Sequence, residues 1–201
     1  MATINLFGAS GHAKVIMDIV EAQGDIVGCL YDDAPNCKEI HGCVEYKADE
    51  KEVEGPLIIS IGSNKIRRLI SERYKINYAT AIHPCSIVSQ SAIIKEGTVV
   101  MQGAIIQPDV QIGRHCIINT GASVDHECQI GDYVHISPHA TLCGNVKIGE
   151  GTWIGAGTTI IPGIKIGKWS VIGAGSVVIN NIPDYVTVVG NPCEKIINKK
   201  L

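Results

Sequence analysis

The 201-residue sequence is poor in aromatic side chains, with one phenylalanine, two tryptophans and six tyrosines, and it has no strong excess of either charge. Its formal net charge of −3 gives no basic surface of the kind that binds nucleic acid or an anionic membrane. It also lacks apolar stretches near the ~20 residues of a membrane-spanning helix, and its first residues lack the features of a signal peptide. We therefore expect a cytoplasmic protein that binds small molecules, with no nucleic-acid partner and no membrane insertion.

A repeat of six residues runs through the second half of the chain. From Val88 to Val178, sixteen consecutive positions spaced six apart all hold valine, isoleucine or leucine. A helix repeats its face every 3.6 residues and a strand every 2, so neither explains this period. A triangular β-solenoid does, because three hexapeptides form one coil and each short strand adds one aliphatic side chain to a continuous core. Fourteen of the 22 glycines lie between residues 86 and 178, which suits frequent tight corners.

The eight cysteines include no Cys-x-x-Cys pair of the kind found in zinc sites and redox motifs. Cys116 and Cys128 fall four residues after an aliphatic position, in a column of mostly small residues. A thiol there is a compact buried filler. We expect most of the cysteines to be buried, reduced thiols, and we expect no metal requirement.

The first eighty residues follow a different pattern, in which short apolar runs alternate with helical segments. This βαβαβ order predicts a Rossmann-like parallel sheet covered by helices. The predicted organisation is therefore a nucleotide-binding α/β domain at 1–80, a linker at 81–85, a parallel β-helix at 86–180 and a C-terminal tail at 181–201. The runs behind this prediction are strands at 4–7, 25–31, 43–46 and 57–61 and helices at 15–22 and 65–74.

A glycine-rich turn follows the first predicted strand. In parallel sheets such a turn, at a helix N-terminus, offers backbone amides to a phosphate, and Gly8, Ser10 and Gly11 fit this role. The motif is not the full dinucleotide fingerprint, since positions 10 and 13 are not glycine, and a turn without a ligand is the alternative. Two other strand ends reach the same rim and supply further candidates for substrate binding: Asp32, Asp33, Gly62 and Asn64.

One solenoid corner has the side chains for acyl transfer. His126 follows an inward-facing valine by two residues, and imidazole is the side chain whose ordinary pKa suits a general base at neutral pH. Glu127 is placed to orient the ring. One coil further along the chain, Gly144 stacks over His126, where its amide could donate to the oxyanion of a tetrahedral intermediate. Cys143 has no base beside it, so we expect direct transfer without an acyl-enzyme.

The hexad register, with isoleucine-glycine pairs at 112, 130, 148, 154, 166 and 172, resembles the hexapeptide-repeat acyltransferases, whose β-helix is left-handed. The run 8–15, the Asp32-Asp33 pair, the run 61–67 and the closing run 189–196 are similar to one branch of that family. This branch holds the sialic acid O-acetyltransferases and the PglD-type UDP-amino-sugar N-acetyltransferases. The resemblance implies that the N-terminal domain binds a UDP-sugar or another nucleotide-sugar, that the solenoid binds acetyl-CoA, and that the enzyme is a homotrimer.

The same resemblance implies roles for single residues. His126 matches the general base of the family, and Gly144 matches the backbone donor to the acetyl carbonyl. His135 matches a histidine near the thioester, and His12 matches one that approaches the sugar from a neighbouring subunit. The resemblance also adds Ile154, Gly155 and Gly173 as acetyl-CoA contacts and Arg67 as a substrate contact.

Three other functions compete with N-acetylation of a UDP-4-amino-sugar. A sugar O-acetyltransferase of the sialic acid type needs the same base and the same oxyanion donor. A zinc lyase of the γ-carbonic-anhydrase kind could use three of the four histidines at 115, 126, 135 and 139, although no two of them are eighteen residues apart. A non-catalytic scaffold would bind the nucleotide-sugar and leave acetyl-CoA unaltered.

Overall fold

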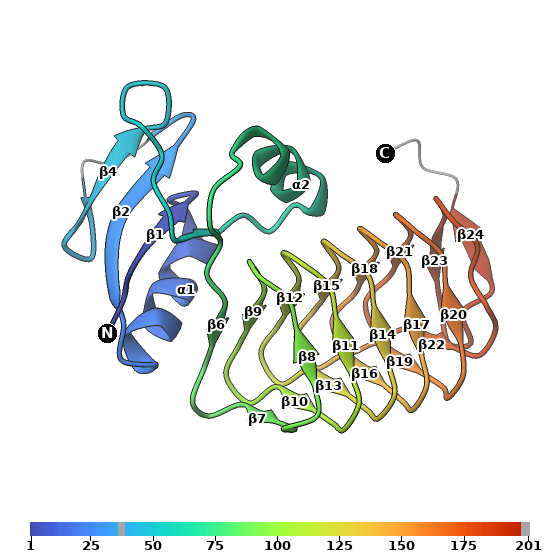
Figure 1. Cartoon of the computed structure of the whole chain (residues 1–201). Helices are drawn as coiled ribbons and strands as arrows, with labels where there is room; N and C mark the ends of the chain where they lie inside the picture. The colour runs from blue at the N-terminus through green and yellow to red at the C-terminus, as the bar shows by residue number, and fades with distance from the viewer. Residues whose placement is uncertain (36–38, 198–201) are drawn as a thin grey trace.

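The computed structural model describes residues 1–35 and 39–197, which form an α/β domain beside a long β-solenoid (Figure 1). The α/β domain contains two helices. Helix α1 begins at Gly11 of the glycine turn, and helix α2 begins at Asn64. Its elements in chain order are β1 (Thr3–Phe7), α1 (Gly11–Ala22), β2 (Ile26–Asp32), β3 (Glu39–Ile40), β4 (Cys43–Lys47), β5 (Leu57–Ile59) and α2 (Asn64–Arg73).

The sheet of the α/β domain has the order β3-β4-β2-β1-β5, with β4, β2, β1 and β5 parallel. The expected parallel sheet is therefore present, but β3 pairs antiparallel with β4 at its edge. The cause is the two-residue turn His41-Gly42, in which φ is +46° and +82°. Positive φ at both central residues is the conformation that closes a tight hairpin.

Three parallel sheets form the sides of the solenoid. Each coil contributes one two-residue strand to each sheet, and partners in neighbouring coils are eighteen residues apart, as for Val124 and Leu142. The strands of the first sheet are β6 (Ala81–Ile82), β9 (Val99–Val100), β12 (Ile117–Ile118), β15 (His135–Ile136), β18 (Trp153–Ile154), β21 (Val171–Ile172), β23 (Thr187–Val189) and β24 (Lys195–Ile197). Those of the second are β7 (Ile87–Val88), β10 (Ile105–Ile106), β13 (Ser123–Val124), β16 (Thr141–Leu142), β19 (Thr159–Ile160) and β22 (Val177–Val178). Those of the third are β8 (Ile93–Ile94), β11 (Gln111–Ile112), β14 (Gln129–Ile130), β17 (Lys147–Ile148) and β20 (Lys165–Ile166).

The second residue of each short strand points into the core, which is the arrangement that the six-residue repeat predicts. Ile118, Val124 and Leu142 are all fully buried in one continuous apolar cluster. Cys116 and Cys128 lie in the same cluster as buried thiols, as expected, whereas Cys85 is exposed. Cys37 lies outside the described residues.

The solenoid extends beyond its predicted limits at both ends. The segment 81–85 is not a separate linker, because β6 within it pairs in parallel with β9 and opens the first coil. Likewise, the predicted tail at 181–201 adds β23 to the first sheet, and β24 then pairs antiparallel with β23. Both additions satisfy backbone groups that the sheet would otherwise leave unpaired at its ends. Residues 198–201 lie outside the described part of the chain.

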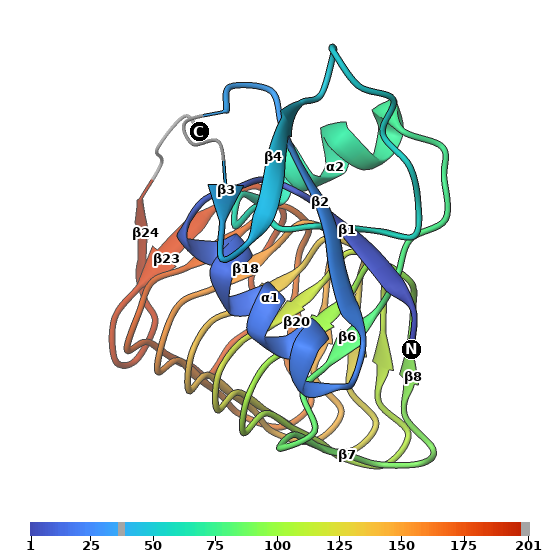
Figure 2. The same ribbon diagram turned by 90° about the vertical axis from the view of Figure 1, so that its left-hand side faces the viewer.

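The α/β domain lies at the N-terminal end of the solenoid, with α1 against the first strands of the first sheet (Figure 2). The apolar face of α1, including Ile16 and Ile19, shares one buried cluster with Val99 and Ile117 on the outer side of that sheet. Neither α1 nor α2 is long and apolar enough to cross a lipid bilayer, and they are the helices of the described residues. The second and third sheets keep their outer faces free of the α/β domain (Figure 1).

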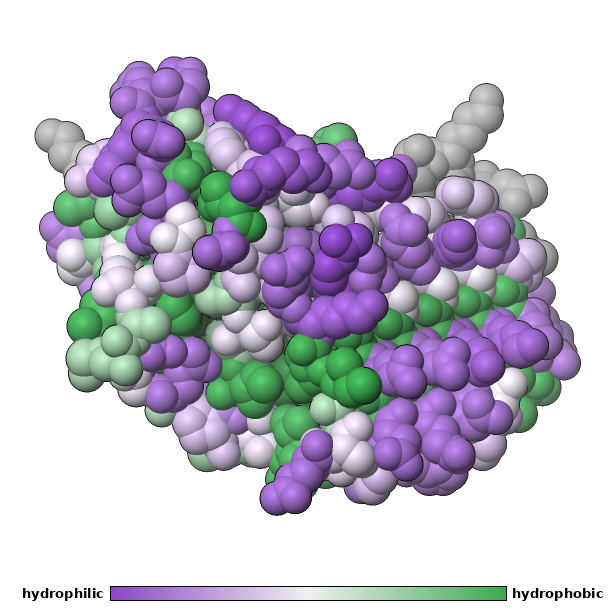
Figure 3. All heavy atoms as spheres, viewed as in Figure 1, coloured by the Kyte–Doolittle hydropathy of each residue, from purple (hydrophilic) through white to green (hydrophobic). Residues whose placement is uncertain are grey.

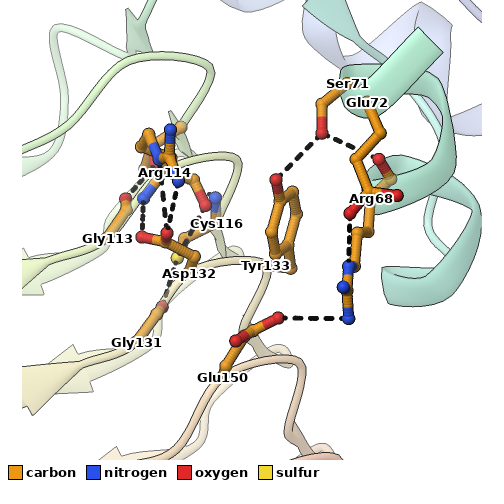
Figure 4. Close-up of polar contacts among 11 residues, drawn as sticks. Arg68, Ser71, Glu72, Gly113, Arg114, Cys116, Gly131, Asp132, Tyr133 and Glu150 are labelled. Atoms are coloured by element: carbon orange, nitrogen blue, oxygen red, sulfur yellow. Dashed lines mark hydrogen bonds and ion pairs between the residues drawn. The ribbon is translucent and has the colours of Figure 1, made fainter.

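Helix α2 lies against one corner of the solenoid, which we call the docking corner and define by residues 113–115, 131–133 and 149–151. The hydroxyl groups of Ser71 and Tyr133 form a hydrogen bond with 2.9 Å between their oxygens, and the Arg68 guanidinium lies 3.4 Å from the Glu150 carboxylate (Figure 4). Figure 4 also shows Arg114 and Asp132 paired across adjacent coils of this corner. These contacts join the two domains over several coils.

We expect Ile118→Ala to lower the free energy of unfolding by about 2–5 kcal/mol, because the truncation opens a cavity in a fully packed coil. Urea unfolding at a fixed protein concentration measures this change. The control is Ile66→Ala on α2, where the side chain is 45% exposed, and there we expect a change within about 0.5 kcal/mol. Equal effects of the two substitutions would contradict the assignment of the aliphatic column to the core.

Candidate functional site

His126 and Glu127 form an exposed pair at the corner between the second and third sheets. We call this the histidine corner and define it by residues 125–127 and 143–145. The His126 Nδ1 atom lies 3.1 Å from Glu127 Oε2, and the two side chains are 57% and 65% exposed. A carboxylate only accepts, so Nδ1 carries the proton and donates it to this bond. The Nε2 atom of His126 is then the free base that faces outward.

Gly144 lies directly over the imidazole of His126. A Cβ atom at this position would come within 2.7 Å of His126 Nε2, so a side chain larger than hydrogen would displace the ring. The Gly144 carbonyl accepts from Gly163, but its N–H has no partner among the described residues. The stacking that the eighteen-residue coil predicts is therefore present, and it leaves an unused amide beside the base.

Glu127 occupies a strained backbone position. Its φ is +61°, in the left-handed region that glycine, asparagine and aspartate tolerate best. The equivalent corner residues in the neighbouring coils are Asp109 and Asn145, with φ of +61° and +57°. The same conformation occurs at other corners of the solenoid, for example at Tyr133 and Trp169 with φ of +60° and +53°, so it belongs to the coil geometry.

The glycine turn borders a pocket of ≈330 Å³ at the carboxyl end of β1. Ser10 and Gly11 line this pocket as predicted, whereas Gly8 is buried with φ of +108° against Ser60 and shapes the turn. The other lining residues were not assigned from the sequence, and of these Ala9 and Lys14 belong to the turn and α1. The hairpin of β3 and β4, which was not predicted, brings the rest, namely Glu39, Ile40 and His41.

The two predicted acids have partners within the domain. Asp32 Oδ2 accepts from the Ala9 amide at 3.0 Å, and its Oδ1 accepts from Ala34 at 2.9 Å. Asp32 thus holds the glycine turn in place from the end of β2. Asp33 forms an exposed ion pair with Arg73 at 2.8 Å.

His12 and His135 form a second, buried histidine group between the glycine turn and the first sheet. Burial and the positive charge of Arg67 lower the pKa of His12 to about 4, and burial, Arg67 and His12 lower that of His135 to about 3. His135 stacks on Trp153 and its Nε2 lies 3.0 Å from the Asn119 amide nitrogen. Since that nitrogen donates, the His135 proton resides on Nδ1, on the side of the Gly62 backbone. His12 Nε2 has no partner among the described residues.

Arg67 and Asn64 do not reach the substrate pocket, which corrects their predicted role. Arg67 is 1% exposed, and each of its five N–H groups donates to an acceptor within the protein. Four acceptors are carbonyl oxygens, namely those of Ile61, Gly62, His115 and Tyr133, and the fifth is Asn64 Oδ1. Asn64 in turn donates to the carbonyls of Gly151 and Thr152. Both residues join the loop after β5 to the docking corner, and Gly62 contributes a carbonyl to this network.

The predicted acetyl-CoA contacts Ile154, Gly155 and Gly173 lie at the third corner. We call this the glycine corner, defined by residues 137–139, 155–157 and 173–175. The Ile154 side chain is fully buried in the core. The N–H groups of Gly155 and Gly173 donate to the carbonyls of Ile172 and Val188, so these two N–H groups are not free to donate to a ligand. The free amides among the described residues of this corner include those of Ala156 and Ala174, one position later in each coil.

The four histidines of the zinc alternative are spread over the solenoid. His115 is buried at the docking corner, His126 is exposed at the histidine corner, and His135 lies on the first sheet. His139 stacks on Gly121 at the glycine corner. Within residues 1–35 and 39–197, no three His, Cys, Asp or Glu side chains are grouped to hold a metal ion.

One chain does not bring the whole predicted site together. The glycine turn, His12 and His135 lie between the α/β domain and the first sheet, whereas His126 and Gly144 lie at the corner where the second sheet meets the third. The chain therefore carries two half-sites on different sides of the prism.

Known family models match both domains of the chain. Residues 3–74 match the family model described as the PglD N-terminal domain, and residues 91–126 and 145–180 match the bacterial transferase hexapeptide repeat. Perosamine N-acetyltransferase of Caulobacter crescentus, solved with CoA and GDP-perosamine, is 34% identical, with a TM-score of 0.90 over 98% of this chain and 97% of that one. The chain belongs to the PglD-type hexapeptide-repeat sugar N-acetyltransferases.

Two further members of this acetyltransferase family are also similar. The acetyltransferase domain of PglB from Neisseria gonorrhoeae is 35% identical, with a TM-score of 0.88 over 96% of this chain and 98% of that one. UDP-N-acetylbacillosamine N-acetyltransferase of Bacillus subtilis is 44% identical over 114 residues. That match spans 50% of this chain and about half, 52%, of the curated relative.

The acetyltransferase should depend on Arg67 far more than on the adjacent arginine. We expect Arg67→Lys to lower the free energy of unfolding by about 2–4 kcal/mol, because an ammonium group cannot satisfy the same five acceptors. Arg68→Lys is the matched control, since Arg68 forms exposed ion pairs that a lysine can also make, and there we expect little change. Chemical unfolding compares the two, and similar losses would show that the buried network does not hold the domains.

Acid should destabilise the acetyltransferase through its buried histidines. Burial, with the charges of Arg114 and Arg67, lowers the pKa of His115 from 6.5 to about 4. Between pH 6.5 and about pH 4, His115 is therefore protonated in the unfolded chain and neutral in the folded chain. Neutral, buried His115 makes its full contribution to the free energy of unfolding above pH 6.5. This contribution is lost as the pH falls, by up to about 1.4 kcal/mol per pH unit.

We accordingly expect His115→Gln to flatten the dependence of the unfolding free energy on pH between 6.5 and 4.5, whatever it does to stability at pH 7. The exposed His41→Gln serves as the control and should leave the slope unchanged. An unaltered slope in His115→Gln would contradict the inference that His115 is neutral in the folded protein.

Proposed function

We propose that the chain is an acetyl-CoA-dependent N-acetyltransferase acting on an amino sugar linked to a nucleoside diphosphate. The observation that carries the proposal is the histidine corner, where Gly144, whose amide has no partner among the described residues, lies directly over the imidazole of His126. The solved relatives that contain CoA and GDP-perosamine support both substrates.

The two groups suffice for direct acyl transfer. The sugar amine attacks the thioester carbonyl while Nε2 of His126 takes its proton, and Glu127 accepts from Nδ1–H and stabilises the imidazolium. The Gly144 N–H donates to the oxyanion of the tetrahedral intermediate. When the C–S bond breaks, the imidazolium returns the proton to the thiolate, which leaves as coenzyme A. No residue is acylated, so Cys143 has no covalent role.

An amine acceptor is favoured over a hydroxyl acceptor by the relatives. Perosamine N-acetyltransferase and UDP-N-acetylbacillosamine N-acetyltransferase are both named for transfer to nitrogen. The pocket at the glycine turn suits the nucleotide part, because it combines backbone amides at the start of α1 with the Lys14 side chain. We keep UDP and GDP as the nucleotides to test, since a relative of each kind is similar to this chain.

We infer that the working form is a homotrimer, because it unites the two half-sites. The outer side chains of the second sheet are uncharged and the α/β domain leaves them uncovered: Ile87, Ile105, Ser123, Thr141, Thr159 and Val177. If this sheet faces a threefold axis, the histidine corner of one copy lies next to the glycine corner of the next. His126 and Gly144 would then meet the Ala156 and Ala174 amides and the sugar-binding domain of a neighbour.

We place the enzyme in the cytoplasm. The seven cysteines of the described residues are all free thiols, which is the usual state in a reducing compartment.

We expect His126→Ala to lower turnover by ~10²-fold or more while coenzyme A still binds, because the variant lacks the base and keeps the rest of the histidine corner. His126→Gln is the matched variant, since it retains a polar group of similar reach that cannot take the proton. Release of free thiol with UDP- and GDP-linked 4-amino sugars measures turnover, and calorimetry measures binding. Near-normal turnover in both variants would remove His126 from the mechanism, and an acetylated Cys143 in mass spectra would exclude direct transfer.

A further inference from the structure

The outer face of the third sheet holds an in-register column of long polar side chains. From the first coil upward the column reads Ile93, Gln111, Gln129, Lys147 and Lys165, with each residue paired to the next across adjacent strands. Lys147 and Lys165 therefore stand side by side at about one strand spacing, ~4.8 Å. Like charges directly opposite on a sheet repel each other.

These lysines line a groove of ≈570 Å³ that runs along the solenoid. Its floor is apolar, and in Figure 3 a band of hydrophobic residues crosses the solenoid between two hydrophilic rows. Lys95 and Lys168 line the same groove. The groove thus combines an elongated apolar floor with four cationic side chains, in a chain whose net charge is −3.

The cations of this groove lack counterions within the described residues. None of the four lysines takes part in an ion pair there. Of the two aspartates in the lining, Asp132 is paired with Arg114 at 3.1 Å. Asp184 accepts from the backbone amide of Lys168 at 2.7 Å. An anion from outside the chain would relieve the repulsion between Lys147 and Lys165.

The groove lies on the third sheet and reaches the docking corner, where Gly113, Gly131 and Gly149 line it. Lys147 lies three residues after Gly144, on the strand that leaves the histidine corner, and Lys165 lies one coil further along. In the trimer described above, the third sheet of one copy faces the α/β domain of its neighbour. Both substrates of the proposed reaction carry phosphates, and both must reach this corner.

We propose that Lys147 and Lys165 form a phosphate-binding site for a substrate of the acetyl transfer. The inference rests on the proposed function and names two residues that no motif pointed to. The diphosphate of coenzyme A and the diphosphate of the nucleotide-sugar have the same chemistry for an ammonium pair. Lysine acts on either as a compact point charge.

The test is calorimetric titration of the purified full-length protein with coenzyme A, with UDP and with GDP, each alone, so that no turnover is needed. We expect Lys147→Gln and Lys165→Gln each to weaken binding of at least one of these probes by about tenfold, and the double variant by more. Lys147→Arg keeps the charge and should restore most of the affinity. Lys75→Gln removes the same charge from an exposed site on the α/β domain and should change nothing.

The outcomes separate the two sources of phosphate. Weaker binding of coenzyme A alone assigns the pair to the acyl donor, and weaker binding of UDP or GDP alone assigns it to the nucleotide-sugar. Added salt should weaken binding to the wild-type protein more than to the double variant. Unchanged affinities for all three probes in the double variant would overturn the site and leave the acetyltransferase proposal intact. Failure of the wild-type protein to bind any of them would overturn both.

Discussion

Stacking of the eighteen-residue coil is the constraint on which the other features depend. Each coil buries its aliphatic side chains only if the coil above keeps the same register, so Val124, Leu142 and Ile160 are fixed one over the next. The same register sets what lies at the corners. It places Gly144 over His126 and Lys165 beside Lys147. The register of the core therefore sets the geometry of both the histidine corner and the lysine pair.

A second constraint is the buried link between the domains. Every N–H group of Arg67 donates to an acceptor, and these acceptors come from both domains. The contacts of Ser71 with Tyr133 and of Arg68 with Glu150 lie beside it. Burying a guanidinium is costly unless every donor is satisfied, so this network exists in one arrangement. It fixes the direction in which the glycine-turn pocket faces relative to the solenoid. A nucleotide-sugar held there is presented from a constant position.

The sequence predicts features that depend on spacing and misses those that depend on three-dimensional partners. The period of six predicts the solenoid core, and the eighteen-residue coil predicts the contact of His126 with Gly144. By contrast, Arg67 and Asn64 follow a strand end as binding residues do, and their burial follows from the docking of α2. Spacing also does not show which amides at the glycine corner are free: the N–H groups of Gly155 and Gly173 are paired, and those of Ala156 and Ala174 are not. The hairpin of β3 and β4 depends on a His41-Gly42 turn that no motif indicates.

The separation of the two half-sites has a consequence for how the enzyme behaves as an assembly. In a ring of three copies, each chain offers its base to one neighbour and its sugar pocket to the other. When a defect at His126 and a defect at the glycine turn are carried by different chains, both can fall in one active site and leave another site of the ring intact. Mixed rings made from two inactive parents would regain intact centres, and dilution of the ring into single chains would abolish every centre at once.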